Sequence, residues 1–228
     1  VARVAERCLT SQAAKVYVAT DDQRIADALE GQVPVVMTRT DHPSGTDRLQ
    51  EVAQQLALAD EDIIVNVQGD EPLIPPALID QVALRLADDP EAAIATLAEP
   101  IADVDTLFNP NVVKVVRSLQ GRALYFSRAP IPWDREHFKA QPSLLETDAW
   151  LRHIGIYAYR ASFLAAYRDL APSSLEQLEQ LEQLRALQHG YAIQVALASA
   201  INPAGVDTEE DLARVRSLLS AEREGGIS

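Results

Sequence analysis

The sequence contains a single cysteine, Cys8, among its 228 residues. One cysteine forms neither an intrachain disulfide nor a cysteine-built zinc site, so a reducing compartment is the default expectation. Long apolar runs are missing too, because no stretch approaches the roughly 18 residues that a membrane-spanning helix requires. We also expect no signal peptide, since Arg3, Glu6 and Arg7 lie among the first residues.

Basic residues are scarce. Lys and Arg total 20 against 34 Asp and Glu, which gives a net charge of -14 at pH 7. Such a surface repels nucleic acid and anionic membranes, and we expect neither as a partner. Seventeen of the 20 cations are Arg, which binds phosphate and carboxylate groups through paired hydrogen bonds. A small polyanion could still bind where arginines and a divalent cation gather.

The composition is otherwise that of a globular protein, with 47% hydrophobic and 24% charged residues. The length suits one large domain, and no stretch of linker composition divides it. We therefore predict a single domain over residues 1–228.

Strand and helix patterns alternate through the first half of the chain, which predicts an α/β sheet with parallel strands. The expected strands are Lys15–Thr20, Val33–Met37, Ile63–Val67 and Ala92–Leu97. The expected helices are Val1–Leu9, Ile25–Leu29, Gly45–Leu58 and a segment opening at Pro75 and Pro76. The continuous apolar run Ile63–Val67 predicts a central parallel strand that is buried on both faces.

The second half is richer in β-structure. Val112–Arg117 and Arg122–Ser127 predict a hairpin, and Arg135–Asp148 predicts an exposed loop. Later strands are expected at His153–Tyr159 and Val195–Ala198, and a last helix at Thr208–Leu219. Leucine recurs at every third residue from Leu175 to Leu187 without glycine or proline, and we predict one helix there, its leucines packing in a core or against a partner.

The segment Asn66–Pro72 directly follows the buried strand, at the sheet edge where α/β proteins bind ligands. Gly69 would allow close approach of a ligand, and Asp70 could face a metal-bound phosphate. A plain strand-to-loop turn explains the same residues equally well.

Two other polar loops precede helices. In Arg39–Arg48, backbone N–H groups at a helix start could bind an anion or a base edge, although an ordinary N-cap by Ser44 or Thr46 is favoured. In Asn202–Thr208, capping of the last helix by Asp207 or Thr208 is a sufficient explanation.

The strand Arg152–Tyr159 places His153, Gly155, Tyr157 and Tyr159 on one face by simple alternation. A lone strand histidine is most often structural, but His and Tyr beside Gly also make a suitable sugar-binding surface. No serine or cysteine motif surrounds His153, so a hydrolase triad has little support.

Six motifs follow one another in a fixed order: DHPSGTDR (41–48), NVQGDEP (66–72), YFSRAPIPW (125–133), LRHIGIYAYR (151–160), LEQLEQLR (178–185) and GVDTEEDL (205–212). With this set the sequence resembles the 3-deoxy-manno-octulosonate cytidylyltransferase family, the CMP-Kdo synthetases, from Val1 to about Leu219. The ordered set is far more specific than any one motif.

The resemblance implies a bacterial cytoplasmic enzyme of lipopolysaccharide biosynthesis that transfers CMP from CTP to 3-deoxy-D-manno-octulosonate (Kdo), with Mg²⁺. It implies a homodimer and the three-layer α/β nucleotide-diphospho-sugar transferase fold, with a mixed, mostly parallel sheet. A β-rich insertion over 112–160 would form the sugar site and dimer contacts.

The resemblance also implies roles for individual residues. Asp70 and Asp207 would be the catalytic metal carboxylates, converging on one Mg²⁺ from the ends of two strands. The expected nucleotide contacts are Arg39, Ser44, Gly45, Arg48 and Gln68. The expected sugar contacts are Arg128, His153, Tyr157, Glu182 and Gln183.

One departure from the family is large. Family members begin with a strand and a loop that wraps the triphosphate, and nothing like it occurs in this sequence. We expect a truncated but otherwise intact enzyme, in which Val16–Thr20 and Ile63–Val67 lack a neighbour to pair with and activity is reduced. The alternatives are a non-catalytic binding relative and a synthetase of the CMP-sialic-acid type.

Overall fold

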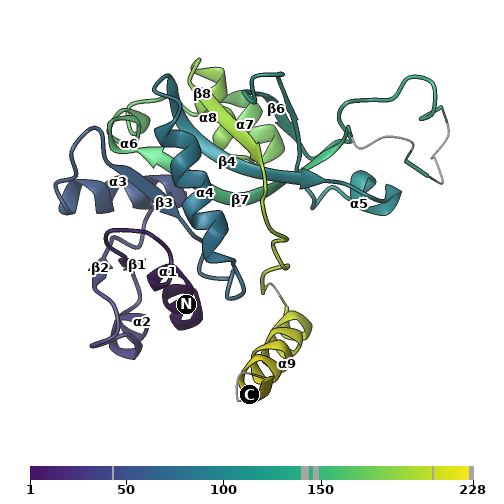
Figure 1. Ribbon diagram of the computed structural model, residues 1–228. Helices are drawn as coiled ribbons and strands as arrows, with labels where there is room; N and C mark the ends of the chain where they lie inside the picture. The colour runs from purple at the N-terminus through teal and green to yellow at the C-terminus, as the bar shows by residue number, and fades with distance from the viewer. Residues whose placement is uncertain (43, 140–143, 146–148, 207, 226–228) are drawn as a thin grey trace.

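The computed structural model describes residues 1–42, 44–139, 144–145, 149–206 and 208–225 (Figure 1). The helices are α1 (Ala2–Leu9), α2 (Gln23–Ala28), α3 (Gly45–Gln55), α4 (Pro76–Ala87), α5 (Val104–Phe108), α6 (Ala161–Tyr167), α7 (Ser174–Glu179), α8 (Gln183–Gln188) and α9 (Glu209–Gly225). The strands are β1 (Val18–Thr20), β2 (Val35–Met37), β3 (Ile63–Asn66), β4 (Ala92–Pro100), β5 (Lys114–Arg117), β6 (Ala123–Ser127), β7 (Leu151–Arg160) and β8 (Ala192–Leu197).

The main sheet is built around the long strand β7. Its strand order is β6-β5-β7-β4-β8, and β3 also pairs with β7. Strand β4 lies along one edge of β7, while β5 pairs with the beginning of β7 and β3 with its end on the other edge. Strands β3, β4, β5 and β8 point in one direction, and β6 and β7 in the other. The predicted mixed sheet with most strands in one direction is confirmed.

The prediction for Ile63–Val67 is wrong in its neighbours and its burial. Strand β3 runs antiparallel to β7 and is half-buried, whereas a central parallel strand was expected. Its apolar run has a different cause: Ile63 and Val65 pack toward one hydrophobic cluster and Ile64 toward another. Each face therefore contacts a hydrophobic cluster without being fully buried, and one edge is open among the described residues.

Strands β1 and β2 form a separate parallel two-stranded sheet, with Val18 opposite Val35. Both segments that we expected to lack a neighbour therefore have one, β1 with β2 and β3 with β7. Together with α1 and α2 they form a small lobe at the lower left of Figure 1. Its core consists of Ala5, Leu29 and Val33.

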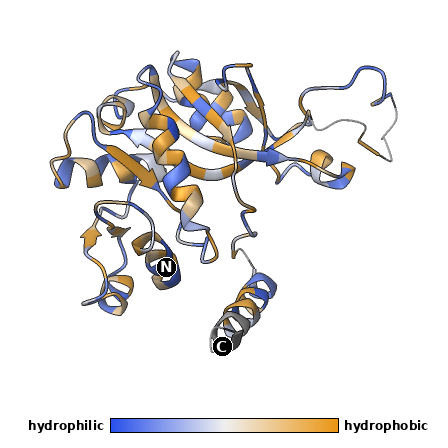
Figure 2. Ribbon diagram, in the orientation of Figure 1, coloured by the Kyte–Doolittle hydropathy of each residue, from blue (hydrophilic) through white to orange (hydrophobic). Residues whose placement is uncertain are grey.

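Helices cover both faces of the main sheet, which gives the three layers that were predicted (Figure 1). On one face α4 buries Leu78, Val82 and Leu86 completely. Pro76 is its first residue, where a missing N–H costs little. On the other face α6 and α8 pack on the sheet, and Figure 2 shows the hydrophobic residues lying between the layers. None of the described helices is both long and apolar enough to cross a membrane.

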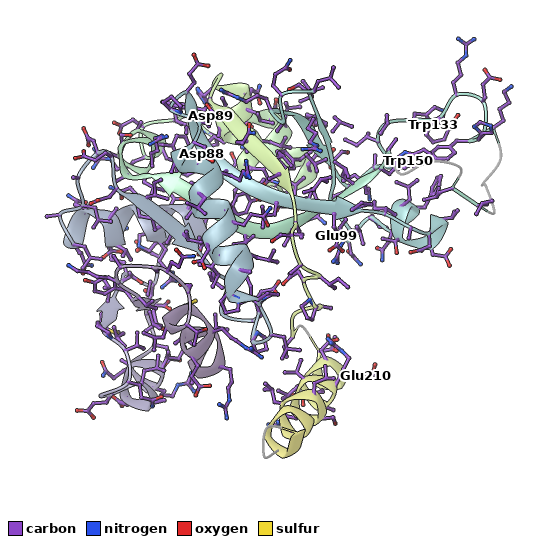
Figure 3. All side chains as sticks on the ribbon, in the orientation of Figure 1. Asp88, Asp89, Glu99, Trp133, Trp150 and Glu210 are labelled. Carbon is purple, nitrogen blue, oxygen red and sulfur yellow. The ribbon has the colours of Figure 1, made fainter. Side chains whose placement is uncertain are left out.

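The predicted hairpin is confirmed as β5 and β6. Gly121 closes it with φ of +82°, and a Cβ there would lie 2.8 Å from the amide nitrogen of Gln194. The region after it corrects an expectation, because Arg135–Asp148 is not wholly exposed in its described part. Phe138 is buried and stacks on Trp150 with ring centroids 5.4 Å apart, beside Trp133 (Figure 3).

The leucine-rich segment is not one helix, as we had predicted, but two. Helix α7 ends at Gln180, whose φ of 54° is left-handed, and α8 begins at Gln183. The break turns Leu181 and Leu184 into the core, while Leu178 stays 82% exposed.

Candidate active site

The turn after β3 lies against the segment that leads into α9. The backbone oxygen of Asp70 accepts a hydrogen bond from the N–H of Val206 at 2.8 Å. A Cβ on Gly205 would approach that oxygen to 3.0 Å, so the two segments fit closely only with glycine there. Gln68, Gly69 and Asp70 are exposed.

Asp207 lies outside the described residues. Its described neighbours are informative, because Val206 is bound to the Asp70 turn and Thr208 forms a reciprocal cap with Asp211. The predicted cap of the last helix is confirmed. A cavity of about 660 Å³ lies between this turn and α9, lined by Gly69, Asp70, Val206, Val215 and Arg216, among others.

Side-chain oxygen atoms of Asn202 and Glu71 lie beside the same turn. Asn202 is buried and donates its amide N–H to Glu71 at 3.4 Å, while its Oδ1 atom has no hydrogen-bond partner among the described residues. Within the described ranges, no group of three His, Cys, Asp or Glu side chains could hold a metal ion.

The start of α3 contacts a residue that is far away in the sequence. Ser44 caps the helix and Thr46 is buried behind it. The Glu182 carboxylate accepts hydrogen bonds from the backbone N–H of Gly45 at 3.4 Å, and from the N–H and hydroxyl of Thr46 at 3.3 and 2.8 Å. A carboxylate is stable here because helix N-terminal N–H groups carry partial positive charge.

The two predicted nucleotide arginines lie apart from this contact. Arg39 is two-thirds exposed and makes a bidentate pair with Asp41, which lowers the pKa of that carboxyl. Arg48 donates to the hydroxyl of Thr38 at 2.6 Å and pairs with Asp21 at 3.1 Å. It thereby joins α3 to the ends of β1 and β2.

One face of β7 carries the aromatic side chains that alternation predicted. The rings of His153 and Tyr157 lie 5.2 Å apart, and that of Tyr159 lies 5.7 Å beyond Tyr157. Burial lowers the pKa of His153 to about 3, so its ring is neutral near pH 7. Burial also raises the pKa of the Tyr157 phenol well above its ordinary value, with nearby Tyr159 and Glu182 acting in the same direction.

Arg128 lies where β6 meets the α7–α8 junction. Its guanidinium donates to the backbone oxygens of Glu179 at 2.7 Å and Pro110 at 3.1 Å, and more weakly to Gln180 at 3.5 Å. The Glu179 carboxylate in turn accepts from the hydroxyl of Ser127 and the N–H of Arg128. The three guanidinium bonds to backbone oxygens occupy three of the five N–H donors of Arg128.

The structure thus brings part of the predicted set together. Glu182 links the start of α3 to the aromatic face of β7, and buried Gln183 follows it in α8. Gln68, expected at the nucleotide, lies beside that face, since a Cβ on Gly155 would be 3.8 Å from its amide nitrogen.

Sequence reasoning missed two members of this region. Thr46 was considered only as a cap, yet its hydroxyl holds Glu182. Thr96 is fully buried in β4 and bonds His153, and its only sequence signal is a lone polar residue inside an apolar strand.

The sequence is similar to those of known cytidylyltransferases. A family model described as "Cytidylyltransferase" matches residues 1–194. The 3-deoxy-manno-octulosonate cytidylyltransferase of Chromohalobacter salexigens is 69% identical, over 99% of this chain and 88% of that protein. The protein of the same name from Alcanivorax borkumensis is 61% identical, over 97% of this chain and 88% of that protein.

Solved structures agree with these relatives. CMP:2-keto-3-deoxy-manno-octonic acid synthetase complexed with CTP has a TM-score of 0.85 and 42% identity, covering 96% of this chain and 87% of that chain. The structure of 4-diphosphocytidyl-2C-methyl-D-erythritol synthase has a TM-score of 0.59 at 14% identity and 96% coverage of this chain (87% of that one), which is a likeness of fold. The chain belongs to the cytidylyltransferase family.

Proposed function

We propose that this protein transfers CMP from CTP to Kdo, forming CMP-Kdo and diphosphate. The observation that carries the proposal is the 69% identity, over 99% of the chain, to a relative named for this reaction. The site supports it, because the turn after β3 and the aromatic face of β7 offer an acidic and a hydroxyl-binding surface at neighbouring strands.

A magnesium ion fits the residues near Asp70. Mg²⁺ prefers oxygen ligands, and it often keeps several waters and substrate phosphates while binding only one or two carboxylates. Asp70 supplies an exposed carboxylate, and Asn202, which donates to the adjacent Glu71, has an Oδ1 atom without a hydrogen-bond partner in the described part of the chain. We propose that Asp70 and Asp207 hold the ion. When bound, it would neutralise charge on the triphosphate.

The other side chains of the chain would bind and orient the sugar. Arg128 suits the sugar carboxylate, because two of its N–H donors remain after its three backbone contacts. His153 is neutral and Tyr157 protonated near pH 7, so both can form hydrogen bonds with hydroxyl groups. Holding the attacking hydroxyl beside the α-phosphate would supply much of the rate enhancement.

The nucleotide would lie along the loop that ends at α3. Ser44 and Gly45 are at the helix start, and Arg48 fixes this loop to β1 and β2. Glu182 contacts Gly45 directly, so a nucleotide and a sugar bound at these residues would be neighbours. Arg39 pairs with Asp41 and is two-thirds exposed, so a nucleotide lying along this loop could reach it from solvent.

We also propose a homodimer acting in the bacterial cytoplasm, with contacts from residues 112–160. The resemblance to CMP-Kdo synthetases motivates both statements. Exposed apolar side chains in this region support the dimer: Leu119, Leu124 and Trp133 are 103%, 62% and 59% exposed.

The first experiment measures diphosphate release with CTP, Kdo and Mg²⁺. Parallel reactions replace Kdo by N-acetylneuraminate and CTP by UTP. We expect turnover with CTP and Kdo only. Turnover with N-acetylneuraminate alone would reassign the sugar, and binding of CMP-Kdo without any turnover would indicate a non-catalytic relative.

The same assay tests the expected need for a triphosphate-wrapping loop. It is run on this chain and on one extended ahead of Val1 with a family-type strand and loop. Faster turnover by the extended chain is expected, whereas equal rates would show that this chain needs no such loop.

A further inference from the structure

An irregularity in the sheet places a threonine hydroxyl beneath the proposed sugar site. Strand β4 pairs with β7 through Thr96 opposite Tyr157, and the next pair is Leu97 opposite Ile154. Two residues of β7, Gly155 and Ile156, are therefore extra at this point. Bulges of this kind disrupt the ladder, re-aim side chains and are frequent beside active sites.

The side chain of Thr96 forms hydrogen bonds with backbone groups of β7 at the bulge. Its side chain is fully buried, and its Oγ1 atom lies 2.7 Å from the backbone oxygen of Ile156 and 3.2 Å from that of Ile154. Both oxygens are acceptors, so the single hydroxyl hydrogen is donated to them, chiefly to Ile156.

The same hydroxyl oxygen also contacts the imidazole of His153. Thr96 Oγ1 and His153 Nε2 are 2.9 Å apart. Since the hydroxyl hydrogen is already donated to a carbonyl, the ring nitrogen must be the donor in this bond. The neutral ring therefore carries its proton on Nε2, and Nδ1 keeps a free lone pair.

The surroundings of His153 preserve that arrangement. Its backbone N–H donates to the backbone oxygen of Val113 at 2.8 Å. The Phe126 ring packs edge-to-face against the imidazole, with ring centroids 5.1 Å apart. Tyr157 is the titratable neighbour, 5.2 Å away, and burial keeps its phenol protonated by raising its pKa. Within the described residues the Nδ1 atom has no hydrogen-bond partner.

We propose that Thr96 is a positioning residue which fixes His153 as the Nε2–H tautomer, so that Nδ1 accepts a hydrogen bond from a sugar hydroxyl. The sugar half of this statement rests on the proposed function. A hydroxyl donor is thereby selected, because an analogue without it leaves the Nδ1 atom of a partly buried ring unpaired.

The tautomer is measured directly by long-range ¹H–¹⁵N NMR of the ¹⁵N-labelled protein. The chain has four histidines, and the His153→Gln variant identifies the signal. We expect a fixed Nε2–H ring in the wild type. A ring protonated on Nδ1, or one that becomes charged between pH 5 and 8, would overturn the proposal before any Thr96 variant is made.

Three substitutions then separate positioning from packing. Thr96→Val keeps the shape but removes the hydroxyl, and we expect mixed tautomers. Thr96→Ser keeps the hydroxyl and restores the Nε2–H form. Thr20→Val is the matched control, a buried β1 threonine that accepts the N–H of Asp22, and it should leave the His153 signal unchanged. An unchanged signal in Thr96→Val would refute the positioning role.

Binding and kinetics test the sugar half. Added Kdo should shift the Nδ1 resonance of the wild type, and Thr96→Val should raise the KM for Kdo by about threefold to tenfold with little change for CTP. A fixed tautomer with no response to Kdo would remove the hydroxyl contact from His153. If CTP and Kdo give no turnover at all, the proposed function fails while the tautomer measurement still stands.

Discussion

Several basic side chains in this protein bind backbone carbonyl groups rather than acids. Lys114 is fully buried and donates to the backbone oxygens of Asn109, Val112 and Arg128. Arg160 likewise binds three carbonyls, at the end of α4 and the start of β4. Sequence alone cannot separate such residues from ligand-binding arginines, because the same donors serve both purposes. Arg128 is both a carbonyl binder and a proposed substrate contact.

At this scale His153 gives a prediction for stability against pH. Its pKa falls from 6.5 to about 3 on folding, so the unfolded chain binds more protons between these values. Stability should be full above about pH 6.5 and decline as the pH falls toward 3, with a slope for this group of at most about 1.4 kcal/mol per pH unit. Partial exposure of the ring reduces that slope.

The measurement is urea unfolding between pH 4 and 8 for the wild type and His153→Gln. The variant should show a shallower acid decline. Parallel curves for the two proteins would mean that His153 keeps an ordinary pKa when folded.

Asp70 gives the second residue-scale prediction. Asp70→Asn should lower turnover by about a hundredfold or more, since a metal carboxylate supplies several kcal/mol. The melting temperature should change little, because the side chain is exposed. Asp88→Asn, an exposed residue beyond the opposite end of α4 (Figure 3), is the matched control. Equal turnover in both variants would end the metal role of Asp70.

At the scale of elements, the sequence predicted a helix, strand or hairpin correctly where residues within that element determine its structure. The cap before α3, the hairpin closed by Gly121 and the strand around His153 all follow from nearby residues. The neighbours of β3 were not predicted correctly. The α/β pattern around β3 is local, but its partner β7 lies far along the chain.

The leucine repeat failed for a geometric reason. Leucines at every third position fall back by about 60° per step on a helix of 3.6 residues per turn, so no single face can hold all five. Breaking the helix at Gln180 buries Leu181 and Leu184 at the expense of Leu178. The break also places Glu182 at the start of α3, a contact that no local pattern indicates.

An ion pair joins the two short helices and gives the element-scale prediction. Glu176 caps α7 and makes a bidentate pair with Arg185 at 2.6 and 2.7 Å, with side chains only 13% and 11% exposed. Glu176→Ala should cost about 3–5 kcal/mol in urea unfolding, because it leaves a buried guanidinium unpaired.

The control for that experiment is Glu6→Ala. Glu6 pairs with Arg3, but the two side chains are 54% and 42% exposed, so the loss should stay below about 1 kcal/mol. Similar losses in the two variants would contradict the role assigned to burial.

At the scale of the whole molecule, the proposed dimer gives a further prediction. Strand β6 is an edge of the main sheet, and Leu124 on it is 62% exposed. Edge strands with exposed apolar side chains are normally covered by a partner. Light scattering after size exclusion should show a dimer for the wild type and a monomer for Leu124→Glu.

Leu178→Glu serves as the control, because Leu178 is also highly exposed but lies on α7, outside residues 112–160. It should leave the dimer intact. A monomeric wild type would dispose of the proposal.

The separate β1–β2 sheet has a consequence for how the protein opens. Its lobe rests on a core of three buried residues, whereas α4 and β4 belong to a far larger one. Hydrogen exchange should therefore be faster in the lobe than in the main sheet. The amides of Val18 and Thr38, which donate to the backbone oxygens of Pro34 and Thr20, exchange through local unfolding of the lobe. Amides of β4 require global unfolding. Because Arg48 ties the lobe to α3, a nucleotide bound there would slow exchange in β1 and β2 and make the lobe a reporter of occupancy.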